Sequence, residues 1–308
     1  MDNIRFEYLS ESNLDKLRDC FNRCRKRRLP LKFFKEKYTT QWSGIPLLGV
    51  IARDKNVPIA LGCTTLYKFK DLLCNYIVAQ CGDLVVDERY RRQGIATQMM
   101  HILEEEAEKK DIDAIVIFPN SNAQNVYEKL PQWKKIGFFA SVSIKVNTIP
   151  VLKLFNKIKL HSIYFKLLQQ QNKTLTAIKN DEIVKNSKIG VSVDNDYLNY
   201  KKYGHYSLLT YNNKTIIWTF SDGLVVLFSE VMTENELKLE IQHLKAFCRK
   251  RGIHEISYYC YSGSNLFTLL SKEYEVVPTL PVYAYQINPK IDLSKIVFNG
   301  IDRNAFDL

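Results

Sequence analysis

Apolar residues recur along the chain with two different periods, which together predict an alternation of helices and strands. Apolar positions three and four residues apart predict helices, and short β-rich runs bounded by turn residues predict strands. In the first half, the predicted helices span residues 13–27, 31–38, 96–110 and 123–130, and the predicted strands span residues 47–53, 59–69, 76–86 and 113–118. The segment 76–86, YIVAQCGDLVV, is apolar and rich in β-formers, so it is expected to be a central strand.

Pro150 marks a predicted boundary between two halves of the chain. The sequence after it, VLKLFNKIKLHSIYFKLLQQQ, predicts a basic amphipathic helix, and polar sequence follows to about residue 193. Later strands are predicted at residues 205–211, 215–220, 224–231 and 255–261, with a helix at 234–251 that Gly252 caps. The order of strands, long helix, strand and short helix therefore occurs twice, which indicates a duplicated architecture.

Length and composition agree with two globular domains. The chain has 308 residues, 46% of them hydrophobic and 25% charged. We expect a domain at residues 1–149, a basic helical connector at 150–192 and a second α+β domain at 193–308. No apolar run approaches the roughly 20 residues that span a bilayer, and the first ten residues lack the apolar core of a secretion signal. The seven cysteines lack paired zinc spacing, so reduced thiols in a cytoplasmic protein are expected.

The net charge of +11 is concentrated in two segments. Residues 16–37 hold ten basic and two acidic side chains, and residues 151–190 hold eight and two. Such clusters attract phosphates, nucleic acid or anionic lipid, although a solvated helix face has the same composition. Because the sequence has no RNA-recognition aromatic motif, zinc finger or helix-turn-helix, nucleic acid is not expected to be the main ligand.

The hexapeptide Arg91-Arg92-Gln93-Gly94-Ile95-Ala96 follows the predicted central strand and opens a long helix. The unpaired N–H groups and the positive dipole end of a helix N-terminus make an anion site. Gly94 and the small Ala96 allow a phosphate to approach the backbone closely, and Arg91 or Arg92 adds charge. The segment matches neither G-x-x-x-x-G-K nor G-x-G-x-x-G, and a plain strand–turn–helix is the alternative.

A second set of residues extends this pattern. Asn120 is followed by Ala123 three residues later and by Tyr127 four residues after that. Together with Arg91, Gly94 and Ala96, these residues resemble the motifs of the GNAT N-acetyltransferase superfamily, and the resemblance covers about residues 4–148. The family's Gly-Phe pair comes later than usual here, at Gly137-Phe138, and residues 133–135 are the alternative match.

The resemblance implies the GNAT fold, an α+β fold with a mixed sheet that splays open after its fourth strand and is flanked by helices. It implies that acetyl-CoA lies in the gap. Leu84, Val85 and Val86 would then pair main-chain groups with the pantetheine arm, as an edge strand pairs with a peptide. Asn120 would steady the same arm from the opposite strand. The pyrophosphate would be held by the residues of the loop and first helical turn, namely Arg91, Arg92, Gln93, Gly94, Ile95, Ala96 and Thr97.

Three catalytic roles are assigned on this basis. Tyr127 occupies the position of the superfamily's tyrosine and would protonate the thioester sulfur, and the Val86 N–H would donate to the oxyanion. Asp83 is the candidate general base, because it is the only carboxylate inside the apolar strand and shares a face with Val85. A structural salt bridge is the alternative for Asp83, and Glu88 in the following turn is a weaker candidate base.

The second half resembles the family more weakly. Residues 194–203, DNDYLNYKKY, resemble an element of tandem GNAT proteins, with Tyr200-Lys201 in place of Trp-Arg. Acids follow Val231 where a basic loop would bind pyrophosphate, which indicates a degenerate GNAT-like repeat that does not bind CoA and shapes the acceptor pocket. An unrelated α+β domain is the alternative. No metal site is expected, since His205, His243 and His254 show no ligand spacing.

The sequence therefore predicts an acetyl-CoA-dependent N-acyltransferase that acts on a primary amine of a small acceptor, by direct attack in a ternary complex. Amino sugars, nucleotide-linked sugars, aminoglycosides, polyamines and protein N-termini or lysines are all candidate acceptors. Among them, the basic segment 16–37 favours an anionic acceptor, such as a sugar nucleotide or an acidic glycan precursor. The alternative is a non-catalytic acyl-CoA- or nucleic-acid-binding module that uses the basic segments 16–37 and 151–190. The sequence makes no prediction of oligomeric state.

Overall fold

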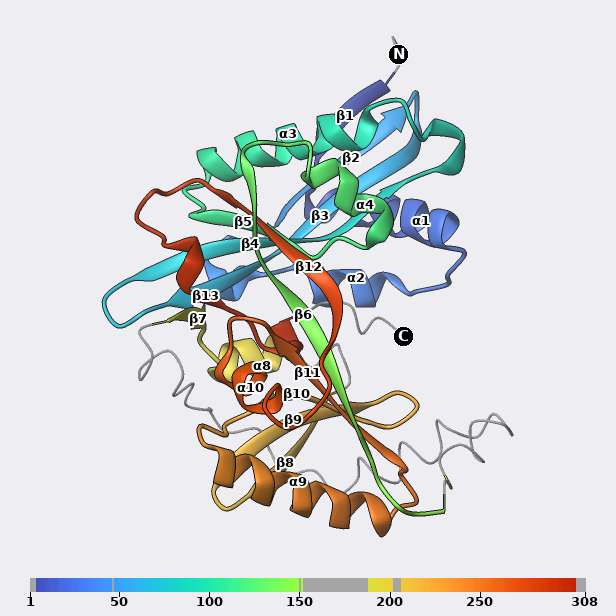
Figure 1. The fold of residues 1–308 in the computed structure, drawn as a ribbon. Coiled ribbons are helices and arrows are strands. Elements are labelled where there is room, and N and C mark those ends of the chain that lie inside the picture. Colours follow the sequence, from blue (N-terminus) through green and yellow to red (C-terminus); the bar gives the residue numbers. More distant parts are fainter. Residues whose placement is uncertain (1–3, 46, 150, 152–187, 202–205, 303–308) are drawn as a thin grey trace. The chain divides into compact units, whose positions relative to one another are not determined.

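The computed structural model describes residues 4–45, 47–149, 151, 188–201 and 206–302 (Figure 1). The chain divides into two compact units. Unit 1 comprises residues 1–136 and 282–294, and unit 2 comprises residues 137–281 and 295–308. Each unit has its own hydrophobic core.

Unit 1 is built on a mixed sheet with the strand order β1-β2-β3-β4-β5-β12. Only β4 and β5 pair in parallel, and the other neighbours pair antiparallel. The strands are β1 (Ile4–Tyr8), β2 (Leu48–Asp54), β3 (Val57–Lys70), β4 (Asn75–Val86), β5 (Ala114–Ile117) and part of β12 (Val277–Gln286). The helices are α1 (Leu14–Arg25), α2 (Leu31–Tyr38), α3 (Ile95–Lys109) and α4 (Ser121–Tyr127).

The helices of unit 1 cover both faces of its sheet. Leu17 of α1 and Phe34 of α2 pack in one core with Ile51 of β2. On the other face, Met99 and Leu103 of α3 pack against strand residues that alternate with the first set. This two-sided burial explains why β4 has a nearly continuous apolar sequence.

The sheet of unit 1 opens between β4 and β5. The parallel pairing runs only from Val78 to Cys81 of β4, yet β4 continues to Val86. Gly82, directly after the last paired residue, is the extra residue of a bulge against β3. The last residues of β4 therefore form a strand edge that β5 does not cover.

Unit 2 has the strand order β6-β11-β10-β9-β8, in which only β10 and β11 pair in parallel. Its strands are β6 (Trp133–Lys145, from residue 137 onward), β7 (Ile189–Val191), β8 (Ser207–Tyr211), β9 (Lys214–Phe220), β10 (Leu224–Ser229), β11 (Glu255–Tyr261) and β13 (Ile296–Val297). The helices are α8 (Asn195–Lys201), α9 (Glu234–Arg249) and α10 (Asn265–Leu270). The apolar face of α9 packs against this sheet through Leu237, Ile241 and Leu244.

The predicted elements of both halves are confirmed to within three residues at each end. The sequence predicted no range for β6 or β12. β6 follows α4 in the chain but pairs with β11, and residues 283–286 of β12 follow α10 but pair with β5. The predicted helix after Pro150 lies outside the described residues. No helix in the described ranges is long and apolar enough to cross a membrane.

Candidate active site

A cavity of about 480 Å³ lies in unit 1 where β4 and β5 diverge. Most residues that the sequence assigned to the acetyl-CoA site line it: Leu84, Val85, Val86, Arg91, Arg92, Gly94, Ile95, Ala96, Thr97, Asn120 and Tyr127. Gln93 and Asp83, also predicted, do not line it. Five residues that the sequence did not assign to the acetyl-CoA site complete the wall: Cys24, Arg25, Tyr90, Ala123 and Val126. Of these, Ala123 was named only as a motif residue and Arg25 only within the basic segment 16–37.

The end of β4 presents main-chain groups to this cavity. The Asp87 N–H donates to the Ile59 carbonyl of β3 at 2.8 Å. Because hydrogen-bonded pairs alternate in an antiparallel ladder, the main-chain groups of Val85 point to β3, whereas those of Leu84 and Val86 point to the uncovered edge. The N–H groups of Leu84 and Val86 are thus directed where an extended ligand can pair with the strand.

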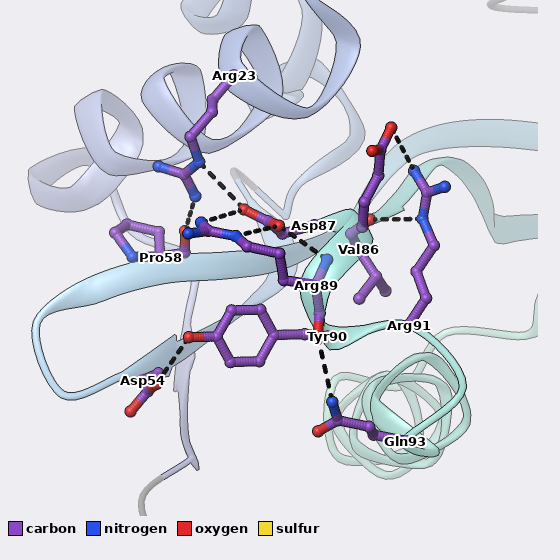
Figure 2. A network of polar contacts seen from close by, with 10 residues as sticks. Arg23, Asp54, Pro58, Val86, Asp87, Arg89, Tyr90, Arg91 and Gln93 are labelled. Carbon is purple, nitrogen blue, oxygen red and sulfur yellow. Dashed lines mark hydrogen bonds and ion pairs between the residues drawn. The ribbon is translucent and has the colours of Figure 1, made fainter.

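A polar network fixes the turn between β4 and α3 (Figure 2). The Asp87 carboxylate accepts from the Arg89 main chain at 3.1 Å and from the Arg89 guanidinium at 3.0 and 3.1 Å. Arg23 of α1 lies 3.4 Å from the same carboxylate and also donates to the Pro58 carbonyl. The hydrogen bonds from Arg89 lower the pKa of Asp87 to about 2, despite the opposing effect of burial. Asp87 therefore stays ionised and ties the turn to α1.

The loop before α3 is held by side-chain hydrogen bonds and contains two residues with left-handed backbone conformations. The Arg91 Nε donates to the Val86 carbonyl at 3.2 Å, so this guanidinium is held against the end of β4. The Gln93 side-chain amide donates to the Arg89 carbonyl at 3.4 Å (Figure 2). Gln93 does not line the cavity. Arg92 and Gly94 both adopt left-handed backbone conformations, with φ of 62° and 74°. Gly94 tolerates this conformation without steric cost.

The N-terminus of α3 faces the cavity without a side-chain cap. Its N-cap residue is Gly94, which forms no side-chain hydrogen bond, and the first turn contains no acid. The N–H groups of Ile95, Ala96 and Thr97 lack intrahelical acceptors because of their position in the first turn. These donors and the helix dipole make the end of α3 a site for an anion.

Asn120 lines the cavity from the loop between β5 and α4, three residues after the end of β5. Its side-chain oxygen accepts from the Ala123 N–H at 3.1 Å and so caps α4. The oxygen is therefore used within the protein, and the amide nitrogen is the group that can donate to a ligand.

Tyr127 is the most strongly buried polar side chain of the wall. The residue is 1% exposed, and its hydroxyl has no hydrogen-bond partner within the part of the chain that the structure describes. Burial raises the pKa of Tyr127 well above its ordinary value, and the nearby Cys81 and Glu104 side chains add to the shift. Since a buried unpaired hydroxyl is costly, this group is a candidate for a contact with a bound ligand.

Aromatic side chains hold the Tyr127 ring. Trp133 packs edge-on at 5.0 Å between ring centroids, and Tyr283 of β12 lies at 6.1 Å. The Trp133 indole donates to the buried Glu104 carboxylate at 2.7 Å, while the Tyr283 hydroxyl donates to Glu128 at 3.2 Å. The ring of Tyr127 is therefore fixed from two sides.

Asp83 lies on the other face of the sheet, where α2 covers it. Its carboxylate is 2.9 Å from the Lys37 ammonium, which is 1% exposed, and it also accepts from the Tyr38 hydroxyl. Burial raises the pKa of Asp83, but Lys37 and Tyr38 outweigh it and the net pKa is lowered. These surroundings favour the structural salt bridge over the general base. Glu88 is exposed and lies 3.9 Å from Arg91.

Two further observations describe the chemistry of the site. The described residues that line the cavity include no carboxylate and no imidazole. Across the described ranges, no three or more His, Cys, Asp or Glu side chains gather as metal ligands would.

Comparisons with known proteins agree with this geometry. Residues 11–130 match the model of the acetyltransferase (GNAT) family. The comparison with curated proteins gave no match. Among solved structures, a probable N-acyltransferase from Enterococcus faecalis is 12% identical, with a TM-score of 0.63 over 92% of this chain and 73% of that one. GCN5-related N-acetyltransferases from Kribbella flavida and Anabaena variabilis are 12% and 15% identical, each with a TM-score of 0.58 over 92% of this chain and over 72% and 73% of theirs.

At these identities the structural similarity establishes the fold. The expected GNAT fold, a mixed sheet flanked by helices, is thereby confirmed. The chain contains a GNAT-type N-acetyltransferase domain, and residues 11–130 belong to that family.

Proposed function

We propose that unit 1 transfers an acetyl group from acetyl-CoA to a primary amine of a small anionic acceptor. The observation that carries the proposal is the cavity at the divergence of β4 and β5. It combines an uncapped helix N-terminus, an uncovered strand edge and a buried hydroxyl that has no partner among the described residues. A helix N-terminus can bind a pyrophosphate, a strand edge can pair with an amide-containing arm, and a hydroxyl can donate to a thioester.

The residues present fit acetyl-CoA. The N–H groups of Ile95, Ala96 and Thr97 would hold the pyrophosphate, and Arg92 would add positive charge. Leu84 and Val86 would pair with the pantetheine amides as a strand edge pairs with a peptide. Asn120 would donate from the opposite wall. Acetyl-CoA supplies an acetyl group activated as a thioester.

The protein contributes positioning and two hydrogen-bond donors to the reaction. The amine nitrogen forms a bond to the thioester carbonyl carbon as the bond from that carbon to sulfur breaks. The Val86 N–H donates to the carbonyl oxygen as negative charge develops there. Tyr127, which is protonated at neutral pH, donates its proton to the departing sulfur. Water carries the proton released by the amine and restores the Tyr127 hydroxyl.

The acceptor class is inferred from the charge beside the cavity. Of the ten basic residues in 16–37, five pair with acids: Lys16, Arg18, Arg23, Lys32 and Lys37. The consecutive residues Arg25, Lys26, Arg27 and Arg28 are exposed and form no ion pair with an acid in the described structure. Arg25 lines the cavity. A cationic rim with no acid in the wall favours an acceptor that carries phosphate or carboxylate groups.

Charge reversal tests the acceptor class. The triple variant Arg25→Glu, Arg27→Glu and Arg28→Glu is expected to raise the KM for an anionic amine by roughly tenfold or more, because the attraction at the rim becomes repulsion. The KM for a neutral amine of similar size should change far less, and added salt should reduce the difference.

The matched control is Lys35→Glu on α2, an exposed cation that does not line the cavity. If the triple variant and the control give the same KM for the anionic amine, the rim does not select the acceptor.

The donor side is tested by thermal unfolding with acetyl-CoA, followed by thiol release with a panel of amines. A ligand at about 100 times its Kd stabilises the folded state by about 2.7 kcal/mol, so a clear rise in Tm is expected. Thiol release should then depend on the amine. Stabilisation by acetyl-CoA without amine-dependent release would instead favour the non-catalytic acyl-CoA-binding module.

A further inference from the structure

The sheet of unit 2 opens in the same way as the sheet of unit 1. The parallel pairing of β10 with β11 runs only from Leu224 to Val226, although β10 continues to Ser229. A bulge at Leu227 directly follows the last paired residue, as Gly82 does in β4. The two halves therefore share both the divergence of two parallel strands and the bulge that begins it.

In unit 2 the opening is filled by the chain itself. Asn299 forms an antiparallel bridge with Cys260 of β11. At Gly300, a Cβ atom would lie 2.9 Å from the Leu227 carbonyl of β10 and 2.9 Å from the Tyr259 carbonyl of β11. Only glycine brings the backbone this close to both strands. The segment thus lies between the two diverging strands.

Neighbouring residues anchor this segment. The Phe298 ring packs edge-on against Tyr261 at 5.2 Å, and β13 directly before it pairs in parallel with β7. Asp302 is 1% exposed and accepts from the Asn299 N–H at 2.6 Å and from the Tyr197 hydroxyl of α8. Burial and hydrogen bonding on both sides of Gly300 keep the backbone in the opening.

The N-terminus of α9, the helix that follows β10, is also capped by hydrogen bonds from within the chain. Thr233 and Glu236 form a capping box at the N-terminus of α9. The Glu236 carboxylate accepts from the Met232 N–H at 2.7 Å and from the Thr233 N–H at 3.2 Å. The Glu236 carboxylate therefore occupies the anion site at the N-terminus of α9, whereas the N-terminus of α3 in unit 1 has no side-chain cap.

We propose that the opening in unit 2 is equivalent to the acyl-CoA cavity of unit 1 and is occupied by the chain's own segment 297–302. Each chain therefore binds acyl-CoA only in unit 1. The proposal rests on the proposed function for its assignment of the unit 1 cavity to acyl-CoA. The cavity that remains beside Gly300 at this opening measures about 20 Å³, room for about one water molecule, against about 480 Å³ at the opening in unit 1.

Two measurements on the intact chain test this proposal separately from the proposed function. In hydrogen exchange without ligand, the amides of Asn299 and Asp302 should be protected like those of β10 and β11. Exchange as fast as in an exposed loop would overturn the proposal, whether or not acetyl-CoA binds. Calorimetric titration with acetyl-CoA should give one molar equivalent per chain. Two equivalents would overturn the proposal, whereas no binding would refute the proposed function alone.

A variant makes the first measurement sharper. Gly300→Ala places a methyl group against two carbonyl oxygens, so exchange of the segment should become roughly tenfold faster or more, while the Kd for acetyl-CoA in unit 1 stays within about threefold. Lys295→Ala, an exposed position just before the segment, is the control and should leave exchange unchanged. If Gly300→Ala exchanges like the control, the segment is not held between the strands.

Discussion

Tyr127→Phe is expected to lower kcat by about two to four orders of magnitude, with the KM for acetyl-CoA within about threefold of the parent value. The substitution removes only the hydroxyl, the group to which we assign protonation of the departing sulfur. The ring itself remains held by Trp133 and Tyr283. Initial rates of thiol release over a range of acetyl-CoA concentrations separate the two parameters.

Tyr283→Phe is the matched control for this experiment. It removes a hydroxyl that bonds to Glu128 within the same aromatic cluster but leaves the cavity wall intact. Its kcat should stay within about threefold of the parent value. A Tyr127→Phe enzyme with nearly normal kcat would contradict the assignment of Tyr127 as the proton donor.

The largest effect on stability is expected from Lys37→Met, which should lower the free energy of unfolding by about 3–5 kcal/mol. The variant leaves the Asp83 carboxylate buried without its cation. An unpaired buried charge costs far more free energy than the loss of a surface ion pair. Lys35→Met on the exposed face of the same helix should change stability by less than about 0.5 kcal/mol. Urea unfolding of the two variants measures the difference.

Asp83→Asn distinguishes the structural role from a catalytic one. The pKa of Asp83 is lowered in the folded state, so its ionisation stabilises the fold above the unfolded-state pKa of about 3.9 and loses that effect as pH falls through the folded-state value. The variant should therefore be less stable at neutral pH but keep the parent pH–rate profile. A shifted profile would restore Asp83 as the general base.

The helices and strands were predictable because each carries a local signal. The apolar run of β4, the periodic pattern of α3 and the small residues between them can be read without knowledge of distant contacts. For the same reason, most of the cavity wall was predicted. Gly94, Ala96 and Tyr127 belong to two motifs that are local in sequence, and the fold brings these motifs to opposite walls.

Long-range pairings explain what the sequence did not reveal. Lys37 was counted within a basic surface segment, yet it is buried against Asp83, 46 residues away. Alternation correctly placed Asp83 and Val85 on one face of β4, but nothing local indicated that α2 covers this face. Likewise, the partners of β12 and of the segment near Gly300 are distant in sequence, so composition alone could not place them.

Transfer of labelled acetyl from acetyl-CoA, followed by mass spectrometry of the acceptor, tests directly whether unit 1 acetylates an anionic amine. We expect labelled N-acetyl product from phosphate- or carboxylate-bearing amines, in proportion to the thiol released and dependent on the Tyr127 hydroxyl. Stoichiometric binding of acetyl-CoA with no labelled product from any amine in the panel would contradict it.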